Sequence, residues 1–176
     1  MAEIDTIVAI LVATMRAGTP LLFAALGELI TEKAGVLNLG IEGMMLVGAV
    51  AGFIAMVLTG SPLIGVLAAM AAGMAMSGLF GFLTLTLMAN QVATGLALTI
   101  FGVGLSAFVG LGYIGNPIQG LPGLAIPVLG DIPVLGSLLF NHDPLVYVSL
   151  VLLAAVTWFL YRSRAGLILR AVGESH

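Results

Sequence analysis

Long apolar runs separated by short polar stretches give this chain its pattern. A helix that crosses a membrane needs about 20 mostly apolar residues. Five segments meet that requirement, at about residues 4–30, 39–59, 62–88, 92–113 and 145–161. The pattern predicts an all-α fold, a polytopic transmembrane helix bundle with about five spans. Residues 1–176 are therefore expected to form one transmembrane domain.

Polar and turn-forming residues mark the breaks in this pattern. Arg16 and the run Gly18-Thr19-Pro20 interrupt the first segment, a turn at residues 59–62 separates the second from the third, and Asn90 and Gln91 precede the fourth. A Pro/Gly-rich connection at about residues 114–144 carries the tandem sequences Ile-Pro-Val-Leu-Gly at 126–130 and 132–136. Such density disfavours a continuous helix. We expect either an ordered surface loop, with or without a short helix lying on the membrane, or a substrate gate.

Composition agrees with lipid as the main solvent of this chain. Hydrophobic residues make up 61% and charged residues 7%, with a mean hydropathy of +1.24, whereas a soluble domain is about 25% charged. The net charge of −3 gives no basic footprint for nucleic acid. Cysteine is absent and the two histidines, His142 and His176, are far apart in sequence. We therefore expect no metal site and no catalytic residue.

The basic residues predict how the chain is oriented in the membrane. Arg162, Arg164 and Arg170 follow the fifth segment, and cytoplasmic loops are enriched in Lys and Arg. Counting back through five spans places the N-terminus and the 114–144 connection outside, and Lys33 inside. The acidic N-terminal residues do not resemble the basic start of a secretory signal, so the first segment is expected to stay in the mature protein.

Small residues recur at helical spacing. Gly48 and Gly52, and the series Gly73, Ser77 and Gly81, are four residues apart. This spacing puts them on one helix face and predicts close packing, within the chain or against a partner. Residues 102–107 match a dinucleotide fingerprint but lie in an apolar helix, where packing is the better interpretation. The sequence has no phosphate-binding loop of the ATPase type.

One charged, glycine-rich stretch, residues 24–52, lies among these apolar runs. Within it, the sequence Asn-Leu-Gly-Ile-Glu-Gly at 38–43 places Glu42 near the start of the second span. Its glycines allow the backbone to depart from a regular helix, as transporters do around a binding cavity. Glu42 either lines such a pathway, or caps the helix start, or pairs with Lys33 or Arg16. Glu28 and Glu42 lack the motif expected around paired protease acids.

Four blocks of sequence carry a resemblance to a known family. They are residues 28–45, 90–98, 131–136 and 166–174. These blocks resemble the permease subunits of bacterial ABC importers, in the group that includes ribose, branched-chain amino-acid and nucleoside permeases. The nucleoside-type permeases are the most similar, and the resemblance covers nearly the whole chain.

The resemblance implies a pore-forming subunit in the bacterial plasma (inner) membrane that works by alternating access. It implies three partners: a second permease subunit, a cytoplasmic ATP-binding subunit and an extracytoplasmic substrate-binding protein. ATP would bind to a partner, and no cofactor is expected on this chain. Nucleosides are the first expectation for the substrate, ahead of simple sugars and branched-chain amino acids. From polarity and position, the expected pathway residues are Glu28, Asn38, Glu42, Asn90 and Gln91.

The resemblance also implies that residues 162–176 begin the cytoplasmic segment that couples to the ATPase. The residues expected to carry this coupling are Arg164, Gly166, Arg170, Gly173 and Glu174. Family members run to roughly three hundred residues, so the chain is expected to be a truncated or partial permease. Two alternatives stay open: a channel or facilitator that needs no ATP, and a truncated remnant without function.

Overall fold

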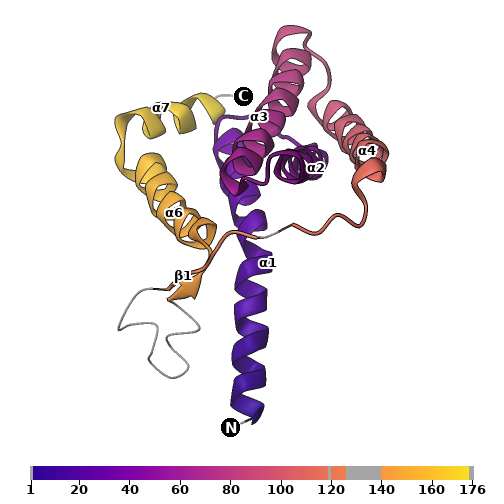
Figure 1. Cartoon of the computed structure of the whole chain (residues 1–176). Helices are drawn as coiled ribbons and strands as arrows, with labels where there is room; N and C mark the ends of the chain where they lie inside the picture. Colours follow the sequence, from indigo (N-terminus) through magenta and orange to yellow (C-terminus); the bar gives the residue numbers. More distant parts are fainter. Residues whose placement is uncertain (1, 119, 126–139, 175–176) are drawn as a thin grey trace. The chain divides into compact units, whose positions relative to one another are not determined.

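The structure is a computed structural model that describes residues 2–118, 120–125 and 140–174 (Figure 1). Helices dominate it. In chain order they are α1 (Ala2–Lys33), α2 (Ile41–Thr59), α3 (Pro62–Gly81), the π-helix η1 (Phe82–Thr86), α4 (Gln91–Gly110), the 3-10 helix η2 (Leu111–Tyr113), α6 (Pro144–Arg162) and α7 (Arg164–Gly173). A two-residue antiparallel pair, β1 (Leu124–Ala125) with β2 (Asn141–His142), joins the ends of the long connection.

Five helices of the described chain are long and apolar enough to cross a membrane. They run from Thr6 to Lys33, Ile41 to Thr59, Pro62 to Thr86, Gln91 to Tyr113 and Pro144 to Arg162. The predicted all-α bundle with about five spans is confirmed. The tandem sequences at 126–130 and 132–136 lie outside the described residues, and the described parts of the connection up to Asp143 contain no helix beyond Tyr113.

Helix α1 differs from the interrupted first segment that the sequence suggested. It continues through Pro20 without a break. A proline removes one backbone donor from a helix, and threonine hydroxyls commonly bond carbonyls one turn back in membrane helices. Here the Thr19 hydroxyl donates to the Met15 carbonyl at 2.9 Å, and the Thr14 hydroxyl to the Ile10 carbonyl at 2.8 Å. Both threonine hydroxyls thus have hydrogen-bond partners within the helix.

The chain divides into two compact units, one formed by residues 35–120 and the other by residues 1–34 with 121–176. In the first unit, α2 and α3 form a hairpin closed by Gly60, whose φ of 68° is left-handed and whose N–H donates to the Met56 carbonyl at 2.8 Å. An added Cβ on Gly52 would lie 2.9 Å from the Gly65 carbonyl oxygen. The predicted close packing at Gly48 and Gly52 is confirmed, because Gly48 similarly faces the Ala69 carbonyl.

The series Gly73, Ser77 and Gly81 does not pack closely against another described helix. An added Cβ on Gly73 or Gly81 would meet nothing within 4 Å among the described residues. The Ser77 hydroxyl bonds the Met74 carbonyl of its own helix at 3.1 Å. Packing of this face within the described chain is therefore not observed.

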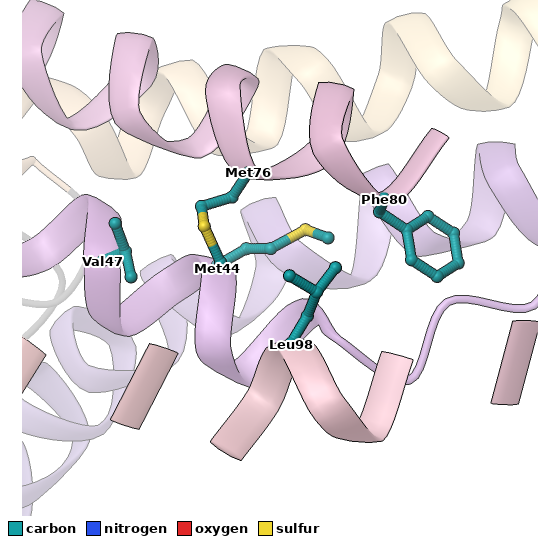
Figure 2. Close-up of a cluster of buried hydrophobic side chains, with 5 residues drawn as sticks. All are labelled: Met44, Val47, Met76, Phe80 and Leu98. Carbon is teal, nitrogen blue, oxygen red and sulfur yellow. The ribbon is translucent and has the colours of Figure 1, made fainter. Parts of the chain in front are cut away.

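Three helices of the first unit share a small apolar core. Its buried members are Met44, Val47, Met76, Phe80 and Leu98. Figure 2 shows the two methionine side chains and Leu98 turned toward one another, from α2, α3 and α4. This core fixes the beginning of α2 between α3 and α4.

The second unit joins α1 with α6 and α7. Asp143 and Pro144 begin α6, where a proline in the first turn costs no hydrogen bond. His142 is fully buried just before this helix, and its backbone N–H donates to the Tyr147 hydroxyl at 3.4 Å. Leu160, near the end of α6, is also fully buried.

Candidate functional site

Residues 35–43, here called the glycine-rich segment, lead into α2. Gly35 has a left-handed φ of 83°, and Gly40 is the residue that precedes the helix. Between them Asn38 is 6% exposed, and its Oδ1 accepts from the Gly40 N–H at 2.9 Å. Its Nδ2 lies 3.6 Å from the Met44 sulfur. The predicted break from regular helix is present, and the Asn38 side chain holds the turn.

Glycines bring this segment into backbone contact with α4. An added Cβ on Gly95 would lie 2.8 Å from the Leu39 nitrogen, and one on Gly102 would overlap the backbone of Gly43. Gly43 in turn faces the Leu98 carbonyl, with no room for a side chain. For Gly102, the packing interpretation of residues 102–107 is confirmed.

Two side chains of α4 bond the backbone of the same segment. The Leu37 N–H donates to Gln91 Oε1 at 2.8 Å. The Thr99 hydroxyl donates to the Leu39 carbonyl at 2.8 Å. Non-helical backbone needs hydrogen-bond partners where water is scarce. Gln91 and Thr99 of α4 supply them to the Leu37 N–H and the Leu39 carbonyl.

Asn90 marks the start of α4. Its Oδ1 accepts from the Ala93 N–H at 3.0 Å, a standard helix cap. The preceding residues are irregular: η1 is a π-helix, and Met88 has a left-handed φ of 53°. The side-chain oxygen of Asn90, one of the five expected pathway residues, therefore caps its own helix.

Glu42 lies in the first turn of α2 with its side chain exposed. A carboxylate suits this end of a helix, where the dipole is positive. The same exposure leaves it accessible to a solute. Both interpretations of Glu42 agree with this position.

Glu28 belongs to the other unit. It is half-buried in α1, and the Thr31 hydroxyl lies 3.3 Å from its Oε2. The structure thus gathers Asn38, Glu42, Asn90 and Gln91 in one unit, and places Glu28 in the second.

The expected coupling residues form a separate helix, α7. Ser163 begins it: its hydroxyl accepts from the Gly166 N–H at 2.9 Å and donates to the Phe159 carbonyl at 2.7 Å. Gly166 is buried against Phe159 and Leu160, and an added Cβ there would overlap the Phe159 carbonyl. The turn between α6 and α7 therefore requires glycine at this position.

The rest of α7 is divided between packed and exposed residues. The Arg170 guanidinium lies 5.3 Å from the centre of the Tyr161 ring, a cation–π distance. Arg164 is exposed, Gly173 ends the helix, and the Glu174 N–H donates to the Arg170 carbonyl at 3.0 Å. Three apolar side chains are also exposed: Leu167, Ile168 and Val172.

Sequence reasoning missed Thr99, Gly95 and Ser163. A single threonine in an apolar helix carries no local signal, because the carbonyl that Thr99 bonds is 60 residues away in the chain. Ser163 could have been found, since a serine directly before a basic, apolar run is a common helix start. Among the described residues, no group of three His, Cys, Asp or Glu could hold a metal ion.

Comparison with known proteins decides the family. The family described as branched-chain amino acid transport system / permease component matches residues 10–176. The chain belongs to this family.

Individual relatives of this permease family point to several solutes. The chain is 45% identical over 166 residues to a putative glucose ABC transporter permease protein of Haloferax volcanii, covering 92% of this chain and 50% of the relative. It is 34% identical to a guanosine ABC transporter permease protein of Bacillus subtilis (98% and 58% covered) and 28% identical to a nucleoside ABC transporter permease protein of Lactococcus lactis (99% and 59%). The chain thus spans about half the length of these curated relatives. No solved structure matches it.

Proposed function

We propose that this chain is the membrane-spanning pore part of an ABC-type importer for nucleosides or related small polar solutes, including sugars. The observation that carries the proposal is the family match over residues 10–176, with relatives named as permeases for guanosine, nucleosides and glucose. Five apolar helices with one glycine-broken helix start agree with such a role.

In this proposal the solute passes the start of α2. The exposed Glu42 carboxylate accepts hydrogen bonds from ribose or sugar hydroxyls, a strong interaction when the acceptor is charged. Asn38, Asn90 and Gln91, which belong to the same unit as Glu42, are the other proposed pathway residues of that unit, and Glu28 is proposed separately for the other unit. Alternating access then follows from two states of the pore that bind the solute differently.

The energy source would lie on a separate ATP-binding subunit, on the cytoplasmic side. Helix α7 is the proposed contact, because it follows the last span and exposes both a cation, Arg164, and apolar side chains. The proposal places the chain in the plasma membrane with its N-terminus outside. A second permease subunit and an extracytoplasmic binding protein complete the complex.

Reconstitution tests this function. The reading frame beyond His176 is determined first, and the full protein is co-expressed with its candidate ATPase, purified through a tag on this chain and placed in liposomes. Uptake of labelled guanosine and glucose is then measured with and without ATP. Uptake that requires ATP supports the importer. Equal uptake without ATP indicates a facilitator, and failure to assemble with any ATPase indicates a remnant; either result overturns the proposal.

A further inference from the structure

The contacts between the glycine-rich segment and α4 follow an ordered path. Gln91, Gly95 and Thr99 are four residues apart, so they lie on one face of α4. Along this face, Gln91 bonds the Leu37 backbone and Thr99 bonds the Leu39 backbone. Between them, Gly95 lies against the backbone of Leu39 and Gly40. Gly43 then reaches Gly102. The segment therefore runs along α4 in the same direction as the helix.

The two hydrogen bonds and the glycine contacts have different physical effects. Glycines permit close approach, but they do not prevent one backbone from sliding along the other. The hydrogen bonds of Gln91 and Thr99 prevent this sliding, because each joins one side chain to one backbone group. Eight residues of helix separate them, about 12 Å along the axis. Two points at this separation fix both the position and the direction of the segment.

We propose that Gln91 and Thr99 are positioning residues: by holding the backbone at Leu37 and Leu39 they set the location of Asn38, which lies between these points, and of Glu42, which follows three residues later. The proposal rests on the proposed transport function and adds Thr99 to the site. It gives Gln91 a positioning role through its side-chain carbonyl oxygen, in addition to its place along the proposed pathway. The start of α2 and the N-terminal half of α4 then move as one body when the pore changes state.

Paired substitutions separate the hydrogen bonds from packing. Thr99→Val keeps the shape but removes the hydroxyl, whereas Thr99→Ser keeps the hydroxyl. Gln91→Met removes the acceptor at similar length, whereas Gln91→Glu keeps an acceptor oxygen. Thr157→Val is the matched control, because among the described residues the Thr157 hydroxyl donates to the Leu153 carbonyl of its own helix, at 2.7 Å, and to no other helix.

The first readout does not need transport. Residues 1–176 contain no cysteine, so a Leu37→Cys reporter in the full protein, with any cysteine beyond His176 replaced by serine, can be labelled specifically in membrane vesicles with a maleimide. Losing one hydrogen bond should speed labelling about two- to tenfold in Thr99→Val and Gln91→Met. Thr99→Ser, Gln91→Glu and Thr157→Val should label at the parent rate. Hydrogen exchange of the peptide containing residues 35–43 gives a second measure without the reporter.

The second readout is ATP-dependent uptake in the reconstituted complex. Thr99→Val should transport more slowly than the parent, and Thr99→Ser should recover the parent rate. Parent-like labelling and exchange in both Thr99→Val and Gln91→Met would overturn the proposal, as would a Thr99→Ser variant more impaired than Thr99→Val. If the parent complex shows no ATP-dependent uptake, the proposed function fails, while labelling and exchange still decide the positioning role.

Discussion

At the scale of single residues, glycines decide where backbones touch. Gly102 and Gly43 meet where α4 crosses the start of α2, and neither position has space for a Cβ. Gly104, two residues along α4, has nothing within 4 Å of an added Cβ among the described residues. The same helix thus carries one glycine that packing requires and one that it does not.

This contrast predicts the effect of Gly102→Ala. The added methyl group must push α4 away from α2, and overpacking of this kind costs about 1–3 kcal/mol. The thermal unfolding midpoint in detergent, followed by circular dichroism, should fall by several degrees. Gly104→Ala is the matched control and should melt at the parent temperature or slightly above, because alanine favours helix. Equal melting of the two variants would contradict the packing argument.

Glu42 gives the residue-scale test of the proposed pathway. Glu42→Gln keeps the size of the side chain but removes the charge that strengthens hydrogen bonds to hydroxyls. A bond to a charged group contributes about 1.5–3 kcal/mol, so ATP-dependent uptake at low solute concentration should fall about tenfold or more. Glu32→Gln, an exposed acid in the last turn of α1, is the control. Unchanged uptake in Glu42→Gln would rule out the pathway role and leave the structural interpretations, the helix start or a pair with Lys33 or Arg16.

At the scale of elements, the apolar pattern predicted the helices well, because length and hydropathy alone define a span. The start of α6 at Pro144 and the turn at Gly60 follow from local residue chemistry. The continuity of α1 through Pro20 could not be predicted, since one missing donor in 32 residues is a small perturbation. The bonds of Gln91 and Thr99 could not be predicted either, because each spans more than 50 residues of sequence.

The stability of helix α7 depends on Ser163, the residue that caps its start. Ser163→Ala removes the cap on the Gly166 N–H, a loss of about 1 kcal/mol for a helix start. Backbone amides of residues 164–174 should then exchange with deuterium about fivefold faster in detergent. Ser77→Ala is the control, since the Ser77 hydroxyl bonds only its own helix. Exchange at the parent rate in Ser163→Ala would show that packing against α6, rather than the cap, holds α7.

At the scale of the whole molecule, the proposed importer needs α7 to meet a cytoplasmic partner. Leu167 and Ile168 are 60% and 64% exposed, next to the cation Arg164. Apolar side chains grouped on a short helix outside the predicted spans commonly mark a protein interface. Arg170 and Gly166, in contrast, pack against the end of α6 and hold the helix in place. The helix thus has one side for its own unit and one side left for a partner.

A double substitution tests this division across the whole complex. Leu167→Ser with Ile168→Ser removes the exposed apolar pair but leaves Gly166 and Arg170 in place. The affinity for the ATPase, measured from the amount that co-purifies with the full protein at several concentrations, should fall about thirtyfold or more, because two interface anchors at about 1 kcal/mol or more each total about 2 kcal/mol or more. Leu58→Ser is the matched control: Leu58 is 70% exposed and ends the second span, on the side predicted to be extracytoplasmic. Loss of ATPase in the Leu58 variant, with retention in the double variant, would reverse the predicted orientation and remove α7 from the coupling interface.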